Sequence, residues 1–146
     1  GDADLLLVSR QGMAIRFNEK IVPPQGGQGM RMADGDELIA ITAVYDDSGV
    51  FLAGADGKGT IRLMSAFAPN KSMGGSGKIA IRNDHVVGAT AVAPADDLFL
   101  ISQLGKIIRF RADEVPSTEG AIQGVNCMGV RFDEVVAVIK SSPKTV

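Results

Sequence analysis

Arginine and lysine residues at repeated positions are the side chains of this sequence best suited to contact a ligand. Arg16, Arg62 and Arg109 each follow an isoleucine and precede Phe or Leu, at spacings of 46 and 47 residues. Guanidinium groups at regular intervals suit the phosphates of a nucleic-acid backbone, where each contact releases a counterion. The alternative is structural, with each arginine paired to a nearby acid such as Glu19 or Glu114.

Further basic residues lie in the turns and strands around these arginines. Together, the basic residues of the hairpin turns and second strands are Arg10, Arg16, Lys58, Arg62, Lys106, Arg109 and Arg111. Two glycine-rich runs, Gly26–Gly29 and Gly74–Gly77, offer backbone N–H groups to phosphate, although such runs are more often simple turns. The net charge is −2, so a nucleic-acid site requires basic residues that are segregated from the acids.

Residues that usually carry catalysis or bind metals do not form a recognisable set. The chain has one histidine, His85, and one cysteine, Cys127. We expect the cysteine to fill space in a core. The segment Gly54–Thr60 lacks the gap and the Gly-Lys-Thr ending of a phosphate loop and fits a hairpin turn. Paired acids such as Asp46–Asp47 fit solvated turns. We therefore predict no catalytic residue, no metal site and no cofactor.

The composition is typical of a β-rich globular domain. Of 146 residues, 45% are hydrophobic, and 18 glycines with no tryptophan favour many tight turns between strands. No apolar run approaches the roughly 20 residues of a membrane-spanning helix, and the first residues lack the basic start of a signal peptide. The expected location is the cytoplasm, without a membrane partner.

Three copies of one unit of about 47 residues make up the chain. The segment Leu5–Phe17 recurs as Val50–Leu63 and again as Leu98–Phe110. Each copy has an apolar stretch, a turn with glycine and a second stretch, which together predict a β-hairpin. The residues predicted to be buried between sheets are Ile15, Phe17, Ile108 and Phe110.

A second, mostly apolar block follows each hairpin after a glycine-rich connection. The three copies of this block are Glu37–Val44, His85–Val92 and Glu134–Lys140. The glycines that mark the connections are Gly29, Gly77 and Gly124. With a weaker strand after each of these glycines, a unit has four strands, and four strands at this period are typical of propeller blades. The predicted fold is all-β, one domain of three four-stranded blades, with repeats over 4–46, 48–93 and 96–140.

The hairpin residues resemble a known repeat. Leu6–Glu19 is similar to the blade motif in the C-terminal domains of the gyrase A and topoisomerase IV A subunits, which ends in Arg-Phe. The third copy, Leu98–Val138, keeps Gly-Lys, Arg-Phe, Val-Pro and Glu-Val-Val in that order. The second copy departs most, with an extra residue at Gly57–Gly59 and with Leu63 in place of Phe.

This resemblance implies a β-pinwheel, a propeller variant whose neighbouring blades exchange strands. It also implies a sequence-nonspecific module that binds and bends double-stranded DNA at its phosphate backbone, with the seven basic residues as candidates for a basic outer rim. Its partners would then be the catalytic subunits or domains of a type II topoisomerase. The family's basic heptapeptide has only a degenerate counterpart at Gln25–Gly29, with no basic residue before Arg31. The alternative function is a protein-interaction scaffold that has lost DNA wrapping.

The number of blades also predicts an assembly. Closed propellers have about four to eight blades, so three leave open sheet edges, which proteins seldom leave bare. We expect either a homodimer that completes six blades or a piece of a longer array.

Overall fold

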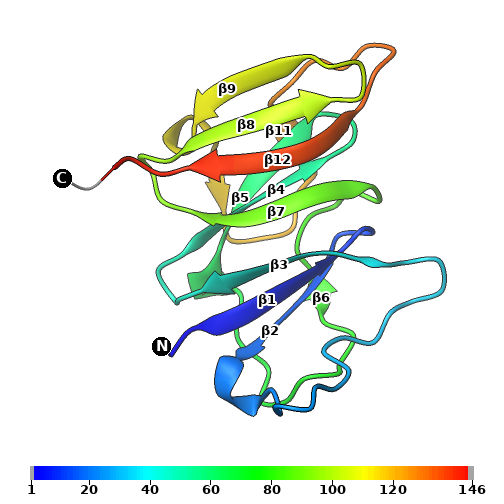
Figure 1. Ribbon diagram of the computed structural model, residues 1–146, viewed down its shortest axis with the longest axis vertical. Coiled ribbons are helices and arrows are strands. Elements are labelled where there is room, and N and C mark those ends of the chain that lie inside the picture. Colours follow the sequence, from blue (N-terminus) through cyan, green and yellow to red (C-terminus); the bar gives the residue numbers. More distant parts are fainter. Residues whose placement is uncertain (1, 145–146) are drawn as a thin grey trace.

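A computed structural model describes residues 2–144, whose regular secondary structure is almost entirely β-strand (Figure 1). The longer strands are β1 (Asp4–Ser9), β2 (Met13–Asn18), β3 (Leu38–Val44), β4 (Gly49–Gly54), β5 (Lys58–Leu63), β7 (Val86–Val92), β8 (Asp97–Ser102), β9 (Ile107–Arg111) and β12 (Val135–Ser141). The short strands are β6 (Lys78–Ile79), β10 (Ser117–Thr118) and β11 (Val125–Asn126). The helical structure of this part of the chain is limited to the 3-10 turns η1 (Glu19–Ile21), η2 (Met64–Ala66) and η3 (Ala112–Glu114). It includes no helix that is long and apolar enough to cross a membrane.

The three predicted hairpins are confirmed. Strand β1 pairs with β2, β4 with β5 and β8 with β9, all in antiparallel orientation. Each turn ends in a glycine with positive φ, namely Gly12 at 87°, Gly57 at 82° and Gly105 at 91°. Glycine adopts this left-handed conformation without the steric cost of a Cβ. The N–H of each of these glycines donates to the carbonyl three residues earlier, so the three glycines mark equivalent positions in the repeats.

The last strand of each repeat forms the inner edge of a sheet. Strands β3, β7 and β12 pair with the first strands of their own hairpins, β1, β4 and β8. Strand β7 lies between β3 and β12, so the three sheets, blades 1 to 3, are stacked with these strands side by side (Figure 1). Because side chains alternate across a strand, each blade has two faces. We call the face with Leu6 and Arg16 in blade 1 the forward face, and the face with Leu7 and Phe17 the backward face.

Each forward face packs on the backward face of the next blade. Between blades 1 and 2, Leu6 and Val8 pack in one core with Leu52. Between blades 2 and 3, Phe51 packs in a second core with Leu98. The two junctions repeat the same arrangement, so burial at a given position can be compared from blade to blade.

The outer edge of a blade is completed by the following repeat. Strand β6, from the second repeat, pairs with β2 of blade 1. Strands β10 and β11, from the third repeat, both pair with β5 of blade 2. The strand exchange implied by the family resemblance is thus confirmed. The prediction of three four-stranded blades needs correction, because exchange leaves sheets of four, five and three strands, with no outer partner for β9 within residues 2–144.

The burial predicted for four hairpin residues is confirmed in part. Ile15 and Phe17 are buried, but they lie under Met30 of the first connection rather than between two sheets. The prediction was wrong about this location because, within residues 2–144, connection residues and not a second sheet cover the backward face of blade 1. Ile108 and Phe110 pack in the core between blades 2 and 3 and are only half-buried.

The glycine just before the exchanged strand β6 lies in close contact with the backbone of blade 1, and this contact gives a test of the fold. Gly77 has φ of 74°, and an added Cβ would collide with the Ala14 carbonyl oxygen. Gly26 has φ of 83° but has nothing within 4 Å of such a Cβ. We expect Gly77→Ala to destabilise the protein by about 1 to 3 kcal/mol more than Gly26→Ala, since only the first adds overpacking to left-handed strain. Urea denaturation measures both, and equal losses would contradict the exchange at β6.

Candidate nucleic-acid interface

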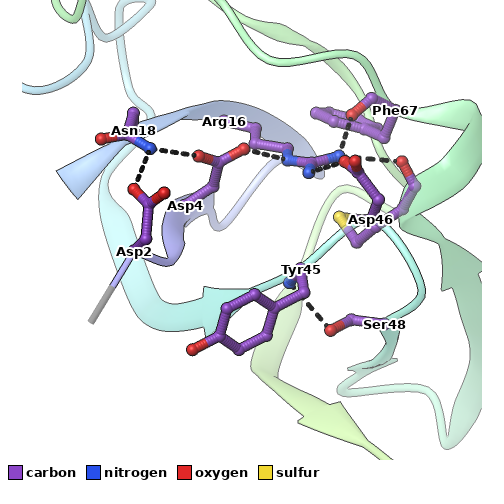
Figure 2. Close-up of polar contacts among 9 residues, drawn as sticks. Asp2, Asp4, Arg16, Asn18, Tyr45, Asp46, Ser48 and Phe67 are labelled. Carbon is purple, nitrogen blue, oxygen red and sulfur yellow. Dashed lines mark hydrogen bonds and ion pairs between the residues drawn. The ribbon is translucent and has the colours of Figure 1, made fainter.

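Arg16, the first of the predicted DNA contacts, lies inside the molecule. It is on β2 and only 2% exposed. Its Nε donates to Asp4 Oδ2 at 2.8 Å, and its Nη2 pairs with Asp46 in the turn that leads to blade 2. Its Nη1 donates to the carbonyl oxygens of Met64 and Phe67, both at 2.9 Å (Figure 2). Arg16 therefore joins blade 1 to the η2 turn of the second repeat.

Arg62 does not occupy the position of Arg16 and Arg109. Those two arginines lie four residues after the turn glycine of their hairpins, whereas Arg62 lies five residues after Gly57. A shift of one residue places a side chain on the opposite face of a strand. The predicted in-register triplet is therefore wrong, and Ile61 takes the arginine position in blade 2.

From the backward face of blade 2, Arg62 points into the same junction as Arg16. It is buried, and it donates from Nη1 to the carbonyl oxygens of Ile79 and Ala80 at 3.0 and 2.9 Å. Its Nε donates to the Glu119 carbonyl oxygen at 3.2 Å. The guanidinium carbon is 5.1 Å from the centre of the Phe67 ring, a cation–π distance. Burial lowers the pKa of Arg62 from its ordinary value.

Arg109 and Arg111 lie on the exposed surface of blade 3. Arg109 Nη2 is 2.6 Å from Asp97 Oδ2, and Arg111 Nη2 is 2.7 Å from Asp113 Oδ2. Asp97 is the counterpart of Asp4, so Arg109 keeps one of the two carboxylate partners that Arg16 has. The acids predicted as alternative partners, Glu19 and Glu114, instead accept backbone N–H groups.

The remaining three candidates lie in the hairpin turns or directly beside them. Arg10 is half-exposed, with its Nη1 4.0 Å from Glu37 Oε1. Lys58 and Lys106 each directly follow the turn glycine, so they occupy equivalent positions on successive blades. In the part of the chain that the structure describes, neither lysine forms an ion pair. These two ammonium groups are therefore available to a ligand.

Three exposed basic residues near the outer edge were missed by the sequence reasoning. Arg31 donates to Ser76 Oγ at 3.0 Å, and Arg82 donates to the Ala121 carbonyl at 3.2 Å. Lys78 is on β6, 4.4 Å from the Phe67 ring centre, and burial together with the charges of nearby arginines lowers its pKa. Each of the three lies within five residues after a repeated connection glycine, which is the signal that could have identified them.

The other residues singled out from the sequence lie in turns, connections or the core. The predicted turn at Gly54–Thr60 is confirmed as the β4–β5 hairpin. The two glycine-rich runs bond to one another, since Gly74 N donates to the Gly29 carbonyl at 2.8 Å. Cys127 packs against the second core, and burial raises its pKa to about 11. Residues 2–144 contain no group of three or more His, Cys, Asp or Glu placed to hold a metal ion.

Comparison with known families assigns this fold. Residues 3–44 and 96–142 match the model of a family described as DNA gyrase C-terminal domain, beta-propeller. The chain belongs to this family. The match covers most of the first and third repeats and leaves out the second, in which the position of the motif arginine is held by Ile61.

Relatives in the DNA gyrase family extend the similarity over the second repeat as well. The DNA gyrase A protein of Haloquadratum walsbyi is 32% identical over 156 aligned positions, which cover 99% of this chain and 18% of that protein. The DNA gyrase A protein of Pseudomonas aeruginosa is 32% identical over 93% of this chain and 16% of its own length. The chain thus spans less than a fifth of either relative.

Two solved structures share the fold. A DNA gyrase A C-terminal domain superposes with a TM-score of 0.84 at 26% identity, covering 95% of this chain and 50% of that one. A C-terminal domain of DNA topoisomerase IV superposes with a TM-score of 0.89 at 17% identity and covers 96% and 47%, respectively. This chain therefore corresponds to about half of each such domain.

Two candidates for DNA contact differ in burial, so their substitution should separate structure from binding. We expect Arg16→Gln to destabilise the protein by about 3 to 5 kcal/mol, because it leaves Asp4 and two carbonyl groups without their buried partner. Arg111→Gln removes an exposed ion pair and should change stability by no more than about 0.5 kcal/mol. Urea denaturation followed by circular dichroism measures both, and a small loss for Arg16→Gln would contradict its role in the blade junction.

Proposed function

We propose that the chain is a DNA-binding and DNA-bending module of a type II topoisomerase, acting without catalysis of its own. The observation that carries the proposal is its membership of the DNA gyrase C-terminal domain family. A likeness to a gyrase A C-terminal domain over 95% of the chain supports it and favours it over the scaffold function. The catalytic subunits or domains of such an enzyme are the proposed protein partners, and the cytoplasm is the proposed location.

The distribution of basic residues supports contact with DNA at the outer edge. The inner strands β3, β7 and β12 contain one basic residue, Lys140. The basic residues of the second hairpin strands and of β6 are Arg16, Lys58, Arg62, Lys78, Arg109 and Arg111. A curved edge of positive charge follows a phosphate backbone without reading bases, and the bend then depends on how readily the DNA deforms.

We divide the basic residues into two proposed roles according to the burial of their side chains. Phosphate contact is proposed for the exposed or half-exposed candidates, which are Arg10, Lys58, Lys106, Arg109 and Arg111. Arg31, Lys78 and Arg82 extend this set. Arg16 and Arg62 are assigned to the blade junction, because their donors are already used by carboxylate and carbonyl groups. Exposed ion pairs are weak, so a phosphate can replace Asp97 or Asp113 beside its arginine.

The salt dependence of binding tests this assignment through the two equivalent lysines. Lys58→Gln and Lys106→Gln should each lower the slope of log affinity against log salt by about 0.9, and the double variant by about twice as much. The slope is measured with a random-sequence duplex at several salt concentrations. Sequence preference should not change, because phosphate contacts carry no sequence information.

Lys140→Gln is the matched control. It removes a lysine from the inner strand β12, where Nζ donates to the Ala91 carbonyl at 2.7 Å, and it should leave the slope unchanged. An equal slope for the double variant and the parent would reassign the contacts to other basic residues. A parent chain that does not bind duplex DNA at low salt would refute the proposed function.

A further inference from the structure

The junction between blades 2 and 3 contains a cavity at the place where the junction between blades 1 and 2 contains the Arg16 side chain. Its volume is about 260 Å³, and it is lined by residues of the second and third repeats. The lining residues include Gly49, Ile61, Pro94, Ala112 and Val115. Both blades of this junction belong to the described part of the chain, so the cavity is bounded by this chain on either side.

Two side chains of the Arg16 cluster are replaced together in blade 2. Ile61 holds the register position of Arg16, and Gly49 holds that of Asp4, the first carboxylate partner of the arginine. A Cβ added at Gly49 would lie 2.7 Å from Ile61 Cγ2, so an aspartate fits there only without the branched isoleucine. The cavity therefore takes the place of the arginine–aspartate pair of the first junction.

The mouth of the cavity carries carboxylate groups of its own. The second carboxylate partner in the first junction, Asp46, lies two residues after β3 and corresponds to Pro94, two residues after β7. Two exposed acids, Asp47 and Asp113, line the cavity instead. Asp113 pairs with Arg111, whereas Asp47 forms no ion pair within residues 2–144. The Asp47 carboxylate is therefore available to a cation.

The backbone acceptors of the Arg16 cluster are kept around the cavity. The η3 turn places Ala112 and Val115 where the η2 turn places Met64 and Phe67, whose carbonyl oxygens accept from Arg16 (Figure 2). Ala112 and Val115 are buried. Within residues 2–144, no side chain donates to either of their carbonyl groups. Buried acceptors without a side-chain donor favour a ligand that donates hydrogen bonds.

We propose that the cavity binds an alkylguanidinium group, which takes the place of the Arg16 side chain. The guanidinium group donates to the carbonyl groups of Ala112 and Val115 and pairs with Asp47 at the mouth. Its alkyl stem packs against Ile61 and the other apolar side chains of the walls. The inference does not depend on DNA binding.

The size and the polarity of the cavity both favour this class of ligand. The volume lies just below the roughly 300 to 1,000 Å³ of sites for drug-sized molecules, so the bound group is small. The walls are mostly apolar and are formed by Ile61, Leu63, Val92, Ala93, Pro94, Ala112 and Val115. An apolar stem with a positively charged end matches these walls and the Asp47 carboxylate together, whereas an anion would be repelled by the acids at the mouth.

Titration with propylguanidinium, which is the arginine side chain as a free ion, tests the site. The methyl NMR signals of Ile61, Leu63 and Val115 should shift together and give a Kd of about 1 mM, within the range for a ligand of this size. Propylurea has nearly the same shape without the charge, so it should bind at least about tenfold more weakly. Equal binding of the two compounds would refute a cation site.

The carboxylate at the mouth gives a second comparison. Asp47→Asn should weaken propylguanidinium binding about twofold to fivefold, the range for an exposed ion pair, and leave the melting temperature unchanged. Asp34→Asn is the matched control, because it makes the same change in net charge at an exposed residue that does not line the cavity. An Asp47→Asn variant with the affinity of the parent would contradict the proposal.

Rebuilding the arginine–aspartate pair should close the site. In the double variant Gly49→Asp/Ile61→Arg, the introduced guanidinium group fills the cavity, so propylguanidinium should no longer shift the Leu63 and Val115 signals. The double variant should also melt at a higher temperature than either single variant. Gly49→Asp alone collides with Ile61, and Ile61→Arg alone lacks a carboxylate partner, so the two changes are coupled.

A folded double variant that binds propylguanidinium as tightly as the parent would place the ligand elsewhere and overturn the proposal. If the double variant does not fold, the propylurea and Asp47→Asn comparisons still decide the question, because neither requires it.

The source of the guanidinium group is distinguished by N-acetylarginine methylamide, which presents the same group on a peptide backbone. Tighter binding than that of propylguanidinium supports an arginine side chain of a partner as the occupant, and weaker binding supports a free ion. No saturable shift with either compound at Ile61, Leu63 or Val115 would refute the site. These measurements use no DNA, so their failure leaves the proposed function untouched.

Discussion

Each blade in this chain lacks a strand that only another repeat can supply, and the rest of the structure depends on this constraint. An open sheet edge exposes unpaired backbone groups, so the connection of one repeat crosses over to pair with the hairpin of the previous repeat. The crossing explains the shared geometry at Gly77 and Gly124, where the new strand begins with positive φ against the older blade. It also brings apolar connection residues such as Phe67 between the sheets. Neighbouring repeats are therefore linked by backbone pairing as well as by side-chain packing.

Because of the same constraint, the motif arginine has different surroundings in blades 1 and 3. In blade 1 the motif arginine, Arg16, is enclosed by the next repeat, and two carboxylates and two carbonyl groups satisfy its guanidinium. In blade 3 the equivalent Arg109 is exposed and contacts the Asp97 carboxylate and the Phe99 ring. A buried charge is tolerated only when its partners are in place, so Arg16 acts as a structural group beneath the blade that follows it. At an uncovered face, the same residue remains open to a ligand or to another blade.

Much of this fold could be predicted from the sequence because the repeat supplies several independent signals. The turn glycines, the paired apolar stretches and the all-β class were predicted correctly. The face of Arg62 was not, because Ile-Arg-Leu looks like Ile-Arg-Phe until residues are counted from Gly57. The exchanged strands span only two residues each, too short for a periodic pattern, and were expected from the family resemblance alone. The division of the basic residues into buried and exposed groups required knowing which blade covers which face.

Strand order also explains how a chain with a net charge of −2 can present the basic edge that we propose as its DNA contact. Net charge counts every ionisable residue equally, but a ligand experiences those near its own path, within about 10 Å at ordinary salt. Asp4 is used inside the first junction, where it neutralises Arg16, and it contributes little to the field outside. The inner strands contain a single basic residue, while the hairpin strands facing the outer edge contain several. Because exchange adds Lys78 to that same edge, the mechanism that closes a blade also increases the positive charge along its rim.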